Sequence, residues 1–284
     1  MTAGMMIWTW FEGTWHQGNF PIMGAADHGA WLGSSVFDGA RAFEGVAPDL
    51  DLHCQRCVAS AEVMGLNPPI SAEEITELAR EGITKFPAGT ALYIRPMMWA
   101  REGGASMVIA NPDSTAFALC LEARPMPEVN GFSITTTPFS RPMNSMAPTD
   151  AKAGCLYPNN ARMLRAAFEK GFDNAVSLDP LGNVAETATS NLWMVKDGVA
   201  LTPAPNGTFL NGITRKRVLG LLRDAGIETH ETTITLDQLR DADEIFSTGN
   251  AQKVMPIIRF DDREYDYGPV ARKARELYWE YSHA

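Results

Sequence analysis

The hydrophobic pattern of this chain consists mainly of short runs of strand-forming residues. Turn signals separate these runs, and a few amphipathic segments lie between them. The run 7–11 (IWTWF) is rich in β-branched and aromatic residues, and Glu12-Gly13 separates it from Thr14-Trp15-His16, which predicts an N-terminal hairpin. Residues 91–95 and 115–121 predict two further strands, joined by a loop rich in Gly and Asn. The pattern also predicts a helix over 53–66 and, from the capping box at 71–74, another that runs toward Phe86.

The second half of the chain repeats this alternation. Strands are predicted near 132–137 and 174–179, and Asp197-Gly198 between 191–195 and 199–201 is a pair favoured in type I′ hairpin turns. A helix over 214–225 is followed by Gly226 at its C′ position, and a final helix covers about 270–282. Because the strands come in hairpins more than in βαβ units, we expect an α+β fold.

Residues 122–128 follow neither the helical nor the strand periodicity of hydrophobic residues, and they contain two prolines, which is typical of a linker. We therefore expect an N-terminal α+β domain over 1–122, a linker over 123–130 and a C-terminal α+β domain over 131–284 that carries Lys152.

Composition narrows the class of protein. The chain has 284 residues, of which 45% are hydrophobic and 20% charged, as in ordinary globular proteins. A net charge of −10 without a basic stripe argues against nucleic-acid binding. No apolar run approaches the ~20 residues that span a bilayer, and residues 1–10 lack the Lys or Arg of a signal peptide. We expect a cytoplasmic enzyme with no membrane or nucleic-acid partner.

Cys54 and Cys57 form a C-x-x-C pair beside His53, which raises the question of a metal site. On the predicted helix, Cys57, Ala61 and Met64 share one face, where cysteine packs as a small hydrophobic residue. Zinc would need a second closely spaced ligand pair, which the sequence lacks. We expect no metal.

Lys152 lies in the small-residue segment 148–157 (PTDAKAGCLY). In a closed site, desolvation would lower the pKa of its amine and make it a nucleophile toward a carbonyl group. On the surface it would be an ordinary lysine. The segment alone leaves both readings open.

Two loops are candidates for binding an anion. Gly212 precedes a helix start at Thr214, where free N–H groups and a hydroxyl would face a phosphate, although Thr214 could simply cap its helix. Residues 247–251 (STGNA) follow a strand-like run and offer further donors, although a plain turn is the alternative. The nucleotide-binding patterns G-x-x-x-x-G-K and G-x-G-x-x-G are both absent.

Three charged residues lie among apolar or small neighbours. Glu186 is either a surface carboxylate or one that keeps a heteroaromatic nitrogen protonated. Arg41 and Arg95 pair either with an internal carboxylate or with one on a ligand. A reactive lysine, a phosphate cradle and a carboxylate on a pyridine nitrogen are together what pyridoxal phosphate requires.

The motifs in chain order are specific in combination: SVFDG-x-R from Ser35, H-x-x-R from His53, Y-x-R from Tyr93, K-A-G-x-x-Y from Lys152, Glu186, G-I-T from Gly212 and T-G-N from Thr248. This series resembles the fold-type IV pyridoxal-phosphate enzymes, in particular the branched-chain amino acid aminotransferases, over nearly the whole chain. The resemblance implies a two-domain fold with the cofactor at the domain interface.

The resemblance also implies roles for individual residues. Lys152 matches the lysine that binds the cofactor covalently and moves the substrate proton, Glu186 the carboxylate on the pyridine nitrogen, and Tyr157 the tyrosine near the ring oxygen. Leu210 matches the residue packed against the ring. The positions that match the family's phosphate-binding residues are Arg56, Gly212, Ile213, Thr214, Thr248, Gly249 and Asn250. Asn250 stands where the family often has threonine.

The substrate pocket implied by the resemblance includes Arg95, which would meet the side-chain carboxylate of glutamate. Leu32 stands where many relatives have a pocket tyrosine. The segment Met107-Val108-Ile109 resembles one lent to a neighbouring subunit, which implies a homodimer or higher homo-oligomer. The remaining pocket positions are Phe37, Arg41, Tyr93, Asn250 and Ala251.

The activity implied is ping-pong transfer of an amino group between branched-chain L-amino acids and 2-oxoglutarate. Alternatives on the same fold are D-amino acid aminotransferase, (R)-selective amine aminotransferase and aminodeoxychorismate lyase. A non-catalytic binding protein is an alternative of a different class, although the presence of both Lys152 and Glu186 argues against it.

Overall fold

The chain folds into two compact units, and the computed structural model describes residues 6–284 of it. The first unit runs to Met126 and also includes Ala151–Cys155, whereas the second comprises Pro127–Asp150 and Leu156–Ala284. The chain thus leaves the first unit inside the expected 123–130 linker. The first five residues of the expected N-terminal domain, which also bear on the signal-peptide question, lie outside the described residues.

The placement of Ala151–Cys155 differs from the expectation that Lys152 belongs to the C-terminal domain. Ala153 forms a β-bridge with Val36, and the Phe37 N–H donates to the Lys152 carbonyl at 3.1 Å. These backbone bonds attach the segment to the first unit, and a pairing so distant along the chain leaves no local mark in the sequence.

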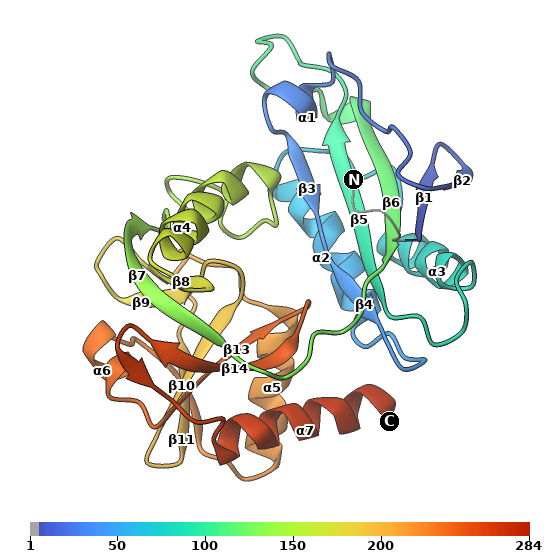
Figure 1. Cartoon of the computed structure of the whole chain (residues 1–284). Coiled ribbons are helices and arrows are strands. Elements are labelled where there is room, and N and C mark those ends of the chain that lie inside the picture. The colour runs from blue at the N-terminus through green and yellow to red at the C-terminus, as the bar shows by residue number, and fades with distance from the viewer. Residues whose placement is uncertain (1–5) are drawn as a thin grey trace. The chain divides into compact units, whose positions relative to one another are not determined.

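The first unit contains a six-stranded antiparallel sheet in the order β2-β1-β6-β5-β3, with β4 also paired to β5 (Figure 1). The predicted hairpin at its edge is confirmed: Glu12 and Gly13 have φ of 48° and 81°, as a type I′ turn requires. The elements are β1 (Ile7–Phe11), β2 (Thr14–Gln17), α1 (His28–Trp31), β3 (Ser35–Phe37), β4 (Ala40–Ala42), α2 (Leu50–Val63), α3 (Ala72–Ile83), β5 (Leu92–Ala100), η1 (Pro112–Ser114) and β6 (Thr115–Ala123).

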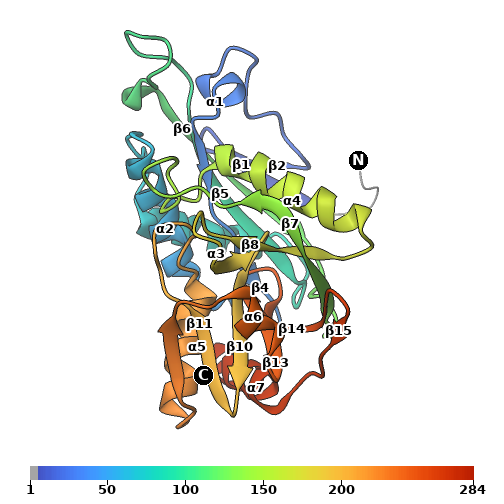
Figure 2. The same ribbon diagram turned by 90° about the vertical axis from the view of Figure 1, so that its left-hand side faces the viewer.

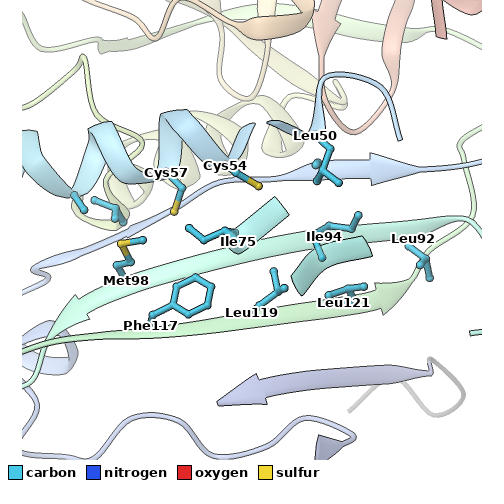
Figure 3. Packing of buried hydrophobic residues seen from close by; sticks show 14 of the residues in the cluster. Leu50, Cys54, Cys57, Ile75, Leu92, Ile94, Met98, Phe117, Leu119 and Leu121 are labelled. Carbon is cyan, nitrogen blue, oxygen red and sulfur yellow. The ribbon is translucent and has the colours of Figure 1, made fainter. Parts of the chain in front are cut away.

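Helices α2 and α3 supply the apolar side chains that face this sheet (Figure 3). The predicted capping box is confirmed, since Ser71 and Glu74 exchange side-chain and backbone hydrogen bonds at the start of α3. Helix α2 begins three residues before the predicted start. The buried cluster in Figure 3 includes Leu50, Cys54, Cys57, Ile75, Leu92, Ile94, Met98, Phe117, Leu119 and Leu121.

The second unit contains a nine-stranded mixed sheet in the order β12-β11-β10-β13-β14-β7-β8-β9, with β15 paired to β14 (Figures 1 and 2). Its elements are β7 (Phe132–Ser140), α4 (Tyr157–Glu169), β8 (Asn174–Leu178), β9 (Val184–Thr187), β10 (Asn191–Lys196), β11 (Val199–Pro203), α5 (Ile213–Asp224), β12 (Thr229–Thr232), α6 (Leu236–Arg240), β13 (Glu244–Gly249), β14 (Lys253–Phe260), β15 (Arg263–Glu264) and α7 (Pro269–His283). The 3-10 turn η2 (Gly154–Leu156) precedes α4.

Several predicted elements of this unit are confirmed. Asp197 and Gly198 have φ of 50° and 79°, and Gly226 at 76° follows α5. Helices α5 and α7 pack together, and α7 also contacts β14. Helix α4, which packs on β7 and β8, was not among the predicted elements (Figure 2). Strand β13 extends to Gly249, so part of the expected 247–251 loop is strand.

Candidate functional site

Lys152 is held by its backbone on both sides. Its N–H donates to the Ser60 hydroxyl on α2 at 3.0 Å, and its carbonyl accepts from Phe37 at the end of β3. A Cβ atom on Gly154 would lie 2.7 Å from the Ser35 hydroxyl, which favours glycine at this position. The Lys152 ammonium nitrogen lies 5.0 Å from the centre of the Phe37 ring. The first unit thus presents Lys152 from a fixed main chain.

Arg56, expected to bind phosphate, is held by Asp38. Its Nε and Nη2 donate to the two carboxylate oxygens of Asp38 at 2.6 and 2.9 Å, and the His53 Nδ1 lies 2.7 Å from Oδ1. Asp38 is fully buried. Burial alone would raise the pKa of its carboxyl, but the Arg56 charge and the hydrogen bonds from His53 and Arg56 hold that pKa well below its ordinary value.

Sequence reasoning assigned no role to Asp38 or His53, although Asp38 is quoted in the first motif. The available signal was a carboxylate inside the otherwise apolar run 36–40, at a position where an unpaired charge would be unfavourable. The charged partners of Asp38 come from α2, beyond the range of any local pattern.

Tyr93 and Arg95 lie on β5 and stack on each other, with the Arg95 guanidinium 5.1 Å from the Tyr93 ring centre. The Tyr93 hydroxyl lies against Gly39, where a Cβ atom would approach it to 2.2 Å. Arg95 also forms an ion pair with Glu122 on β6 at 3.2 Å. The internal salt bridge left open for Arg95 is therefore present.

Arg41 on β4 bonds to uncharged acceptors within the first unit. It is almost fully buried, and its described hydrogen bonds go to the Arg124 carbonyl at 2.7 Å and to the Met126 sulfur at 2.9 and 3.2 Å. Burial, reinforced by the nearby Arg124 charge, lowers the pKa of Arg41 to about 10, so that the side chain stays cationic at neutral pH. These bonds fix the end of the first unit, and the substrate-pocket position that the resemblance implies for Arg41 stays a prediction.

Met107 and Val108 lie in the loop between β5 and β6. The Met107 carbonyl accepts from the His28 Nε2 at 3.0 Å, while the side chains of Met107 and Val108 are 66% and 72% exposed. The loop is thus fixed at its backbone and presents apolar side chains outward.

In the second unit, Glu186 on β9 is buried between two polar side chains. Arg141 forms an ion pair with one carboxylate oxygen at 3.4 Å, and the Asn191 amide donates to the other at 3.2 Å. Arg141 is itself oriented by Asn160 and by the Thr208 carbonyl, at 2.7 and 2.9 Å. The carboxylate is therefore fixed in position, and the surface reading of Glu186 is wrong.

Asn191 also connects Glu186 to the start of α5. Its Nδ2 donates to the Leu210 carbonyl at 3.0 Å, and its Oδ1 accepts from the Gly212 N–H at 3.1 Å. A Cβ atom on Gly212 would lie 2.1 Å from that oxygen, so only glycine fits here. Sequence reasoning missed Asn191, because its partners lie about 5 and 20 residues away on separate elements.

The start of α5 is a potential anion site. Gly212 is its N-cap and offers no capping side chain, and Ile213 and Thr214 are buried in the first turn. The reading of Thr214 as the helix cap is therefore wrong. The free N–H groups of a first turn carry the partial positive charge of the helix dipole.

The loop after β13 lies next to this region through strand pairing, since Asn191 is the register partner of Thr248. The Thr248 hydroxyl accepts from the Trp193 indole at 2.9 Å. The Asn250 Oδ1 accepts from the Lys253 ammonium at 2.9 Å, whereas the buried Asn250 Nδ2 has no hydrogen-bond partner among the described residues. Ala251 is exposed, as is Tyr157 at the start of α4.

The cysteine pair lies in the apolar core of the first unit. Burial raises the pKa of the Cys54 thiol to about 11 and that of Cys57 well above its ordinary value, which disfavours the metal-binding thiolate. Within residues 6–284 no cluster of three or more His, Cys, Asp or Glu side chains could hold a metal ion.

Pyridoxal phosphate fits the donors of the second unit. Glu186 supplies a fixed carboxylate for a basic nitrogen, the α5 start supplies amides for a phosphate, and the Asn250 Nδ2 supplies a further donor.

Across the described part of the chain, no helix is long and apolar enough to cross a membrane.

Comparison with known proteins agrees with these features. Residues 35–260 match the family model described as amino-transferase class IV. A branched-chain-amino-acid aminotransferase of Pseudomonas aeruginosa is 33% identical over 95% of this chain and 91% of its own length. The crystal structure of a Brucella abortus aminotransferase bound to PLP is 60% identical, with a TM-score of 0.97 over 98% of this chain and all of the other.

The branched-chain amino acid aminotransferase from Escherichia coli is similar in structure, with 27% identity and a TM-score of 0.89 over 98% of this chain and 94% of its own. The family match covers most of the sequence and includes the motifs at both Lys152 and Glu186. The chain therefore belongs to the class IV aminotransferases.

Proposed function

We propose that this protein is a pyridoxal-phosphate-dependent transaminase that exchanges amino groups between branched-chain L-amino acids and 2-oxoglutarate. The names of its relatives support the reaction and the substrate class. The main structural support for this cofactor is the pair of hydrogen bonds that the Asn191 side chain forms, one with Glu186 and one with the Gly212 amide. One residue thus fixes a carboxylate and a helix-start anion site in the same unit, as a ligand with a basic ring nitrogen and a phosphate would need.

Bound pyridoxal phosphate supplies an electron sink for the charge left when the substrate Cα loses its proton. Glu186, held by Arg141 and Asn191, would keep the ring nitrogen protonated. The amides of Ile213 and Thr214 would hold the phosphate, a role proposed for Arg56 as well, and Leu210 would pack on the ring. The Lys152 amine would anchor the cofactor and move the Cα proton, and its fixed main chain limits the positions that the amine can reach.

The substrate side of the proposal rests on the first unit. Phe37 and Tyr93 supply apolar and aromatic surface for an aliphatic side chain, and Arg95 binds the second carboxylate of 2-oxoglutarate or glutamate. The same pocket must accept both kinds of substrate, so Arg95 needs another carboxylate partner when an aliphatic side chain is bound. Glu122 provides it, since its Oε2 lies 3.2 Å from the Arg95 Nη2.

We further propose a cytoplasmic homodimer. The exposed apolar tip formed by Met107, Val108 and Ile109 is suited to cover by a second copy of the chain. All four cysteines are free thiols, as is usual in a reducing compartment.

A half-reaction screen tests the function. The enzyme loaded with pyridoxal phosphate is mixed with L-Leu, L-Ile, L-Val, D-Ala or (R)-1-phenylethylamine, and the loss of its visible absorbance is followed. We expect a response to the three branched-chain L-amino acids and none in Lys152→Ala. A response to D-Ala or to the amine alone would replace this proposal with one of the alternative transaminases.

A further inference from the structure

Lys253 is a fully buried lysine at the start of β14, directly after the loop that carries Asn250. Its backbone φ is +61°, in the left-handed region that glycine prefers. Its ammonium nitrogen lies 5.6 Å from the Tyr278 ring centre and donates to the Asn250 Oδ1 at 2.9 Å. A charged side chain at a buried, strained turn position suggests a task that glycine could not perform.

That hydrogen bond fixes the Asn250 amide in one of its two orientations. An ammonium group can only donate, so the carbonyl oxygen of the amide must face Lys253. Because the amide is planar, its Nδ2 then points away from the lysine. Nδ2 is buried and has no hydrogen-bond acceptor within the described part of the chain, a state that is unfavourable unless a ligand supplies the acceptor.

The surroundings of Asn250 identify the class of that acceptor. Gly249 packs on Ser190, and Thr248 pairs in register with Asn191, which bonds the Gly212 amide at the start of α5. The Asn250 loop thus lies on the strand next to the helix-start anion site. An anion bound at the free amides of α5 would supply the acceptor that Nδ2 lacks.

We propose that Lys253 is a positioning residue for the cofactor phosphate, because it holds the Asn250 amide with its N–H directed at that phosphate. The lysine itself does not touch the phosphate. It selects the donor end of the amide and excludes the flipped orientation, which would turn a carbonyl oxygen toward an anion. This inference rests on the proposed function, since it requires pyridoxal phosphate as the ligand.

The test compares two ligands that differ only in the phosphate. Cofactor-free protein is titrated with pyridoxal phosphate and with pyridoxal, and both dissociation constants are taken from the quenching of tryptophan fluorescence. The ratio compared between variants is the dissociation constant of pyridoxal divided by that of pyridoxal phosphate, which measures the preference for the phosphate. Both ligands carry the aldehyde, so the contribution of Lys152 cancels in the ratio.

Lys253→Met keeps the length of the side chain but removes its donor. We expect the ratio to fall about tenfold, which is the contribution of one hydrogen bond to a charged acceptor. Asn250→Ala should lower the ratio to a similar extent, and the double variant should lose no more than either single one, because both act through one amide. Equal losses of affinity for the two ligands in Lys253→Met, or losses that multiply in the double variant, would overturn the proposal.

Asn250→Asp keeps the lysine and the shape of the side chain, so it covers the case in which Lys253→Met does not fold. One of its oxygens still accepts from Lys253, while the other puts an acceptor where Nδ2 stood. We expect a larger fall in the ratio than in Asn250→Ala, and an unchanged ratio contradicts the assigned orientation.

The wild-type protein shows whether the cofactor is in question or only the roles of Lys253 and Asn250. A wild-type chain with no preference for pyridoxal phosphate over pyridoxal would remove the proposed cofactor, and this inference with it. A wild-type preference that is undiminished in both Lys253→Met and Asn250→Asp would overturn the roles of Lys253 and Asn250 and leave the proposed cofactor in place.

Discussion

Replacing Asp38 by asparagine should destabilise the first unit and loosen the arginine expected to bind phosphate. Asp38 is fully buried and accepts four hydrogen bonds, two from Arg56, one from the Gly39 N–H at 2.7 Å and one from His53. Asparagine keeps the shape but removes the charge and one acceptor. Arg56 would then face an amide N–H in place of a carboxylate oxygen.

The magnitude follows from this geometry. Removing one partner of a buried ion pair typically costs about 3–5 kcal/mol. The Arg56 side chain is 17% exposed and can recover some hydration, so the lower end of that range, about 3 kcal/mol, is expected. With a urea m-value of about 2–3 kcal/mol/M, the unfolding midpoint should fall by about 1 M.

Urea denaturation of Asp38→Asn, followed by tryptophan fluorescence, measures this change. Asp51→Asn is the matched control, because Asp51 is an exposed carboxylate in the first turn of α2 and should change the stability by less than about 1 kcal/mol. If Asp38→Asn unfolds at the same urea concentration as the wild type, the Asp38–Arg56 pair is not the stabilising contact described above.

The same pair predicts a pH dependence. The pKa of Asp38 is depressed in the folded state from an ordinary value of 3.8. Its stabilisation is therefore fully present above that value and is lost as the pH falls toward the folded-state pKa. The stability difference between wild type and Asp38→Asn should be constant from neutral pH down to about pH 5 and shrink below about pH 4. A difference that is as large at pH 2 as at neutral pH would contradict the sign of this linkage.

Two further substitutions test the chemistry. Glu186→Gln keeps a polar partner for Arg141 and Asn191 but removes the charge, so kcat should fall by about 10²–10³, as when one preorganised electrostatic contact is lost. An unchanged kcat in steady-state assays would remove Glu186 from the mechanism. Glu122→Gln releases Arg95 from a partly exposed pair worth up to about 1 kcal/mol, so the KM for 2-oxoglutarate should fall by up to about fivefold while that for leucine stays constant. A higher KM for 2-oxoglutarate would show that Glu122 instead holds Arg95 in place.

The sequence predicted the elements whose signals are local. The turns at Glu12-Gly13 and Asp197-Gly198, the capping box at Ser71 and the glycine after α5 each follow from a few neighbouring residues, and each is present. Helix α4 is not predicted from the sequence, because its ends carry no N-cap side chain that marks a helix start. Lys152 and Glu186 could be singled out because their residue types conflict with their small neighbours.

The partners of those residues could not be predicted in the same way. Asp38, Arg141 and Asn191 act through contacts with elements far along the chain, which only the folded structure brings together. The partners of Arg41 could not be predicted for the same reason. A buried arginine signals a need for acceptors but does not show that the Arg124 carbonyl and the Met126 sulfur supply them.

In the proposed enzyme Lys152, and not another lysine, carries the cofactor. The enzyme loaded with pyridoxal phosphate is reduced with borohydride, which makes the link between lysine and cofactor permanent, and is then digested for mass spectrometry. We predict the added mass on the peptide that contains Lys152 and its loss in Lys152→Ala. An adduct on the peptide that contains the buried Lys253, or none on either, would contradict the assignment of Lys152.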